Sequence, residues 1–299
     1  EAYARAGRQG ADPEFLPRMK DGFTGVIGIL RCGAGPTVAL RFDMDALPLT
    51  ESAEQDHFPA ACGFVSENDG AMHACGHDGH VTVGLGTARV LAACRSQLHG
   101  TLKFIFQPAE EGVRGARSIV EKGHLDGVDY LLAAHMAGNA AVKTCCIGVG
   151  SGGTLATTKY DANFLGKSTH AGFSPQLGRY AMLSAATAVL NLHAIPRHGD
   201  AATRVNVGRL VAGTGRNLVC DRAKLVLEVR GNTSEANAYM AAYAERILHA
   251  AAEKHGCEVE ISCVGAAECS SNSPELSAFV MDTVRKAGLK AEEVHGDGS

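Results

Sequence analysis

The stretch TVALRFDMD, residues 37–45, decides the fold that we expect for this chain. Its first six residues predict a buried β-strand, because they are mostly apolar or β-branched. Two aspartates, Asp43 and Asp45, follow directly where that strand ends. A polar pair at this point of a strand is typical of a ligand-binding edge in α/β proteins.

The same arrangement recurs twice further along the chain. A strand predicted over Thr101–Phe106 is followed by a proline and an acidic pair, and a strand over Tyr130–Ala134 is followed by a histidine. Helical patterns over Gly79–Ala93 and Arg114–Lys122 separate the strands. This alternation predicts an α/β fold with a doubly wound, mostly parallel sheet, whose strands end at one common edge.

A different pattern follows a glycine-rich break at residues 148–153. The predicted order is strand, helix, two strands, helix, strand, which is typical of a ferredoxin-like α+β unit. These elements are Thr157–Leu165, Arg179–His193, Thr203–Leu210, Lys224–Arg230, Ser234–Lys254 and Glu258–Val264. A last helix over Pro274–Ala287 is expected to return to the first domain. We therefore expect a catalytic domain from residues 1–153 and 266–299, with residues 154–265 inserted as a second domain.

Composition indicates an ordinary soluble globular protein. The 299 residues are 45% hydrophobic and 20% charged, with a net charge of −4 and no basic block, which argues against nucleic acid and acidic membranes as partners. No apolar run is long enough to span a bilayer. The ten cysteines are scattered, so we expect most to be small buried residues of a protein in a reducing compartment, the cytoplasm.

Candidate metal ligands are concentrated in Met72–His80, which holds three histidines, a cysteine and an aspartate. Gly76 lets Cys75 and His77 face one point, since glycine adopts backbone conformations that other residues avoid. His73 and His80 are interpreted as packing residues that support the cluster. Candidate ligands therefore come from two residues of this segment and from the strand ends.

Cys75, His77, Glu111 and His135 together offer one sulfur, two nitrogens and one carboxylate. Such a set suits zinc, manganese or cobalt better than calcium or magnesium. Glu110 remains free to take a proton from a metal-activated water, which predicts metal-assisted hydrolysis, with an amide as the first candidate substrate. Two other interpretations stay open at this point. One is a cysteine hydrolase that uses Cys75, and the other is a non-catalytic binding protein.

These motifs, taken together and in order, resemble the M20 metallopeptidase family, in particular its amidohydrolase branch. The matching segments are Arg41–Pro48, Met72–His80, Phe106–Gly112, His135, Ser168–Gly172, Arg204–Gly208, Ala212–Asn217 and Glu228–Gly231. Within this branch, the sequence is most similar to members that hydrolyse p-aminobenzoyl-glutamate. Two segments support this closer resemblance, Gly22–Gly25 and Ala156–Asp161.

The resemblance implies a site with two zinc or manganese ions held by Cys75, His77, Glu111 and His135. Cys75 would bridge the ions, Glu110 would be the general base, and Asp45 would orient a ligand or tune the site. The implied reaction is hydrolysis of an N-aroyl or N-acyl amino acid, with p-aminobenzoyl-glutamate as the leading substrate. Another N-acyl amino acid or a dipeptide is the alternative.

The resemblance also implies a role for the inserted domain as a lid and a dimerisation surface, in a homodimer or in a heteromer with a homologous subunit. His170 would reach the site across that dimer, while Asn217 and Arg230 would grip the substrate carboxylate, to which a guanidinium pairs bidentately. A further metal-binding histidine of the family follows a Gly-Ser-Glu-Asp-like segment. The sequence stops at residues 296–299, where that segment begins, so we expect an incomplete ligand set in the chain as given.

Overall fold

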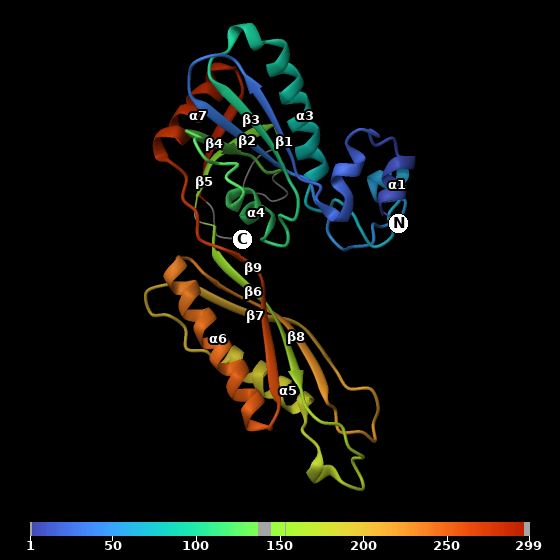
Figure 1. Cartoon of the computed structure of the whole chain (residues 1–299). Coiled ribbons are helices and arrows are strands. Elements are labelled where there is room, and N and C mark those ends of the chain that lie inside the picture. The colour runs from blue at the N-terminus through green and yellow to red at the C-terminus, as the bar shows by residue number, and fades with distance from the viewer. Residues whose placement is uncertain (1, 137–144, 153, 296–299) are drawn as a thin grey trace. The chain divides into compact units, whose positions relative to one another are not determined.

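A computed structural model describes residues 2–136, 145–152 and 154–295 (Figure 1). The chain divides into two compact units, residues 1–138 and 139–299. Residues 296–299, on which the expectation of a missing ligand depends, lie outside the described residues. The predicted domain boundaries at residues 153 and 266 stay a prediction.

The first unit is built on a four-stranded, mostly parallel sheet. Its strands lie in the order β1 (Val26–Arg31), β3 (Thr101–Gln107), β2 (Thr37–Asp43) and β4 (Tyr130–Ala133). β2 runs parallel to both β3 and β4, whereas β1 is antiparallel to β3. The register pairs Asp43 with Gln107 and Arg41 with Ala133. The ends of β2, β3 and β4 therefore meet at one edge, as the sequence pattern predicts.

The long helix α3 (His77–Ala93) packs on this sheet at close range. A β-carbon at Gly84 would lie 2.7 Å from Phe106 and 2.8 Å from Phe42, so only glycine fits between helix and strands. α3 begins at His77, two residues before the predicted start, and its first turn lies at the edge where the strands end. The smaller elements are α1 (Ala2–Arg8), η1 (Leu16–Gly22), α2 (Phe58–Ala61), η2 (Arg95–Gln97) and α4 (Gly115–Glu121).

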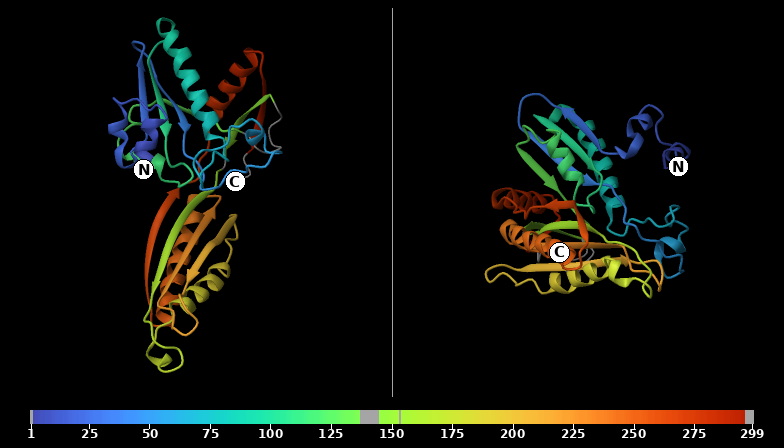
Figure 2. Two further views of the ribbon diagram at one scale, coloured as in Figure 1. Left: turned by 90° about the vertical axis from the view of Figure 1, so that its right-hand side faces the viewer. Right: turned by 60° about the horizontal axis from the view of Figure 1, so that its bottom comes forward.

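The second unit contains the predicted ferredoxin-like arrangement. Its antiparallel sheet has the order β7 (Thr203–Ala212), β8 (Arg222–Gly231), β6 (Ala156–Leu165) and β9 (Glu258–Ala267). Helices α5 (Ala181–His193) and α6 (Ser234–Lys254) contact each other and the sheet, so they cover the same face (Figure 2). Phe164, Leu192, Leu225, Met240 and Leu248 are buried completely and form the centre of its core. A short helix, η3 (Pro175–Leu177), precedes α5.

The helix expected over Pro274–Ala287 is present, but the two strands on which it packs, both in the second unit, were not expected from the sequence. β5 (Cys146–Gly152) pairs in parallel with β10 (Lys290–His295), and α7 (Pro274–Lys286) packs on both strands. Residues 148–152, interpreted above as a break, therefore belong to a strand. None of the helices within the described residues is both long and apolar enough to cross a membrane.

The expectation that most cysteines are buried is wrong. Only Cys220 and Cys257 are buried, whereas Cys62, Cys145 and Cys263 are exposed and the other five are half-buried. All ten are free thiols.

Candidate metal centre

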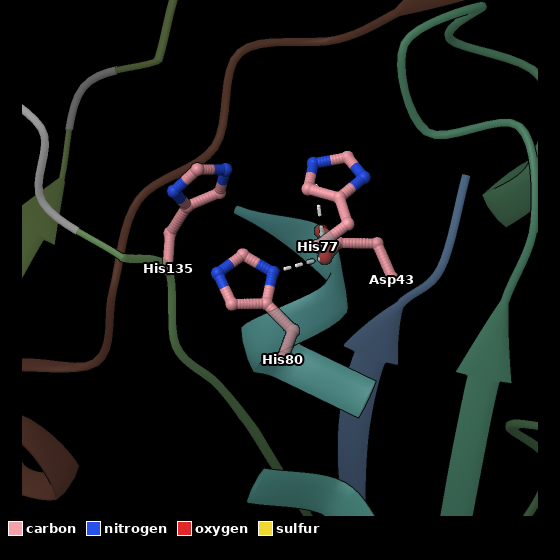
Figure 3. Close-up of side chains that lie close together, drawn as sticks. All are labelled: Asp43, His77, His80 and His135. Carbon is pink, nitrogen blue, oxygen red and sulfur yellow. Dashed lines mark hydrogen bonds and ion pairs between the residues drawn. The ribbon is translucent and has the colours of Figure 1, made fainter. Parts of the chain in front are cut away.

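The candidate ligands come together at the edge where β2, β3 and β4 end. Figure 3 shows His77 and His80 on the first turn of α3, Asp43 at the end of β2, and His135 on the segment after β4. Glu110 and Glu111 follow the end of β3. Gly76, just before α3, has a φ of 82° in the left-handed region, and it makes the tight turn expected between Cys75 and His77.

His77 is the buried centre of the group. Its side chain has no solvent exposure, and neither ring nitrogen makes a hydrogen bond with any described residue. Nδ1 lies 3.6 Å from Asp45 Oδ1, and Nε2 lies 3.9 Å from a carboxylate oxygen of each of Glu110 and Glu111. Buried polar atoms without hydrogen bonds are rare in folded proteins. A buried ring without hydrogen bonds that faces several carboxylates fits a cation site.

Three of the four predicted ligands, Cys75, His77 and Glu111, offer atoms within 4.8 Å of one another. The fourth joins through Cys75, because its Sγ lies 3.4 Å from His135 Nε2. Nδ1 of His135 donates to the carbonyl oxygen of Met136 at 2.8 Å, which leaves the lone pair on Nε2. A histidine held in this way is ready to bind a metal through Nε2. Sulfur, imidazole and carboxylate ligands in this combination suit zinc or manganese, so the residues fit the implied metal.

Burial, a hydrogen bond to Glu111 and the charges of nearby carboxylates together raise the pKa of the Cys75 thiol to about 11, with burial as the largest cause. The thiol is consequently protonated near neutral pH in the absence of a cation. Since the thiolate is the reactive form, this environment argues against Cys75 as a free nucleophile.

The acidic pair after β3 is held by Asp45. The backbone N–H groups of Glu110 and Glu111 donate to the two oxygens of its carboxylate, at 2.9 and 3.1 Å. The turn also places Ala109 at a φ of 54°, a conformation that costs about 1 kcal/mol or more for a residue other than glycine. Asp45, which the resemblance implies would orient a ligand or tune the site, thus has the geometry of a group that positions this turn.

Glu110 lies half-exposed at the edge of the group. Burial raises the pKa of its carboxyl, and the charges of Glu111 and Asp43 raise it further, while Arg41 lowers it. A raised pKa makes a carboxylate a stronger proton acceptor. The side chain therefore suits the predicted role of general base.

Sequence reasoning did not assign a role to Asp43, which is completely buried. Asp43, His77, His80 and His135 form a second group with atoms within 4.8 Å of one another (Figure 3). His80 cannot supply a ligand to it, because Nε2 accepts from the backbone N–H of Met136 at 2.8 Å and Nδ1 is hydrogen-bonded to Asp43. The interpretation of His80 as a supporting residue agrees with this geometry.

The three predicted substrate-binding residues lie in the second unit and do not all meet there. His170 and Asn217 are neighbours, because Ala171 donates to the carbonyl oxygen of Asn217 at 2.9 Å. β8 begins at Arg222, shortly after Asn217, and Arg230 lies near the end of this strand. The eight residues from Arg222 to Arg230 span roughly 27 Å along a strand. The guanidinium of Arg230 pairs with the carboxylate of Glu228.

Comparison with known proteins agrees with the fold and the motifs. Residues 39–299 match the family described as "Peptidase family M20/M25/M40". The chain is 48% identical over 274 residues to indole-3-acetyl-aspartic acid hydrolase of Enterobacter agglomerans, covering 91% of this chain and 62% of that protein. It is 46% identical over 279 residues to one of the subunits of p-aminobenzoyl-glutamate hydrolase from Escherichia coli K12, covering 93% and 64%. The chain thus spans less than two thirds of these relatives.

Solved structures give the same result. An aminobenzoyl-glutamate utilization protein from Klebsiella pneumoniae superposes with a TM-score of 0.83 at 37% identity, over all of this chain and 70% of that one. A dinuclear metal-binding peptidase of the M20 family from Bacillus subtilis superposes with a TM-score of 0.65 at 28% identity, over 95% and 71%. The chain therefore belongs to peptidase family M20/M25/M40.

Proposed function

We propose that this chain belongs to a metal-dependent amidohydrolase that cleaves the amide bond of an N-aroyl or N-acyl amino acid. The observation that carries the proposal is the buried ring of His77, which has no hydrogen bond with a described residue and lies beside Cys75 and Glu111, with His135 facing Cys75 and Glu110 at the open side. A soft ligand set next to a carboxylate with a raised pKa is the combination that metal-assisted hydrolysis uses.

Cys75, His77, Glu111 and His135 would hold two zinc or manganese ions. The bound ions would polarise the amide carbonyl and make a water acidic near neutral pH. Glu110 accepts the proton of the attacking water and then delivers it to the nitrogen of the leaving amino acid. Asp45 keeps Glu110 in place through the backbone of the turn.

The substrate we propose is a conjugate of an aromatic acid with an acidic amino acid, with p-aminobenzoyl-glutamate first. Two relatives named for p-aminobenzoyl-glutamate and for indole-3-acetyl-aspartate support this class. Asn217 and Arg230 would bind substrate carboxylates, and His170 would contact the reacting carbonyl from a partner chain. The second unit would then act as a lid and dimerisation surface, in a homodimer or with a homologous subunit. The ten free cysteines favour the cytoplasm.

The test is hydrolysis of p-aminobenzoyl-glutamate, indole-3-acetyl-aspartate and acetyl amino acids by protein loaded with zinc or manganese. Glu110→Gln should retain the metal, measured by elemental analysis, and lose about 100- to 10,000-fold in turnover, which is the usual contribution of a general base. Failure of the loaded wild-type protein to cleave any of these amides would contradict the proposal. Full turnover by Glu110→Gln would remove the general base from it.

A further inference from the structure

Two buried polar residues beside the metal ligands have no place in the ligand set, namely Asp43 and His80. A buried carboxylate is costly unless every oxygen is paired. In Asp43 one oxygen accepts from Arg41 Nη1 at 2.6 Å, and the other is hydrogen-bonded to His80 Nδ1. Arg41 is itself fixed, since its Nε donates to Gln107 Oε1 at 2.9 Å. Asp43 is therefore a rigid acceptor for the imidazole of His80.

The protonation of His80 follows from its partners. The backbone N–H of Met136 donates to Nε2, so this nitrogen carries the lone pair, and the proton must lie on Nδ1, which donates to Asp43. One end of His80 is thus anchored to β2 and the other end holds a peptide group 56 residues away in sequence.

That peptide group joins His135, a candidate ligand, to Met136. The N–H of Met136 is bound by His80, and the carbonyl oxygen of Met136 accepts from Nδ1 of His135. The rings of His80 and His135 also pack edge to face, with centroids 4.5 Å apart. Both backbone contacts are made by Met136, so His80 anchors the residue whose carbonyl oxygen keeps the proton of His135 on Nδ1 and leaves Nε2 facing Cys75 Sγ.

We infer that Asp43 and His80 are positioning residues for the metal centre, acting through the backbone of Met136 to hold His135 with Nε2 toward the metal. The inference rests on the proposed function, because it takes His135 as a ligand. Outer groups of this kind typically change metal affinity 10- to 100-fold when they are removed.

The first test is a double-mutant cycle on cobalt affinity, using Co²⁺ because its visible absorption bands report the ligand geometry. His80→Leu should weaken Co²⁺ binding 10- to 100-fold and alter these bands. In a His135→Ala background the same substitution should have almost no further effect, since the two residues then act as one unit. Equal losses in both backgrounds would overturn the inference. Leu225→Val, in the core of the second unit, is the control and should leave affinity unchanged.

His80→Gln serves where His80→Leu does not fold, because an amide both accepts and donates at a similar spacing. It should keep affinity within about threefold of wild type, and a larger loss in folded protein would contradict the inference. The second test uses ¹⁵N chemical shifts of the His135 ring in metal-free protein. They should report a proton on Nδ1 in wild type and a mixture of tautomers in His80→Leu, and unchanged shifts would overturn the inference. Absence of Co²⁺ binding by wild type would count against the proposed function, and the ¹⁵N shifts would then decide the role of His80 alone.

Discussion

Replacing Asp45 by asparagine keeps the size of the side chain and removes its charge. The remaining carbonyl oxygen can accept from only one of the two backbone N–H groups, and the new amide group faces the other as a second donor. A hydrogen bond to a charged group contributes about 1.5–3 kcal/mol. Since the Asp45 side chain is 19% exposed, we expect a loss near the lower part of this range, about 2 kcal/mol. That corresponds to a fall of roughly 4–8 °C in the unfolding midpoint.

The effect on turnover should be larger than the effect on stability. The turn carries both the proposed base, Glu110, and a proposed ligand, Glu111, and a displacement of about 1 Å in such groups costs on the order of 100-fold in rate. The assay is kcat/KM for p-aminobenzoyl-glutamate at saturating metal, beside thermal unfolding followed by circular dichroism.

Asp129→Asn is the matched control for this variant. Asp129 also accepts a backbone N–H, that of Thr37 at 2.8 Å, but at the opposite end of β2. It should cost some stability and leave turnover at saturating metal unchanged. Wild-type turnover in folded Asp45→Asn would refute the argument that Asp45 positions the acidic pair.

Three further predictions concern other parts of the molecule. Burial and a hydrogen bond to Glu245 raise the pKa of Tyr160 above its ordinary value of 10, so its stabilising effect is complete below pH 10 and is lost as pH rises beyond it. Tyr160→Phe should therefore shift the alkaline unfolding midpoint to higher pH, and an unchanged midpoint would show that other groups control it. Gly84→Ala should destabilise the protein by about 1–3 kcal/mol through overpacking against Phe42 and Phe106, whereas Gly86→Ala on the same helix, where a β-carbon meets no atom, should be neutral or stabilising in denaturant titrations. In metal-free protein near pH 7, iodoacetamide should label the exposed Cys62 well before Cys75, because the pKa of Cys75 is about 11. Mass spectrometry of peptides gives the order of labelling. Faster labelling of Cys75 would restore the case for a reactive thiolate.

Hydrophobic patterning was sufficient to predict the parallel strands and the ferredoxin-like unit, because these elements carry their own apolar faces. It was not sufficient for β1 and β10. β1 contains Gly28, which weakens the local signal of a strand, and β10 is rich in charge. β1 is stabilised by pairing with β3 and β10 by pairing with β5. Such long-range pairing leaves no trace in the local sequence pattern.

The residue types of the candidate site were also predictable, since sulfur, imidazole and carboxylate groups at strand ends indicate a metal site. The different roles of the two aspartates after β2 could not be predicted from the sequence. Asp43 turns inward to His80, and Asp45 turns toward the backbone after β3, and these partners lie 37 and about 65 residues away. The contact between His80 and the Met136 peptide is likewise long-range and involves a main-chain group that every residue possesses.

The parallel register of β2, β3 and β4 has a consequence for how the protein matures. Parallel strands require a crossover connection between them, so the candidate ligands reach one another only after long loops have closed; Cys75 and His135, for example, are 60 residues apart. During synthesis, an ion cannot engage the full set before β4 has left the ribosome and joined the sheet. Metal captured at that moment stabilises only the folded chain, by about 2.7 kcal/mol at a free concentration 100 times the dissociation constant. With metal bound at the proposed centre, metal supply in the cell would therefore affect the yield of folded protein.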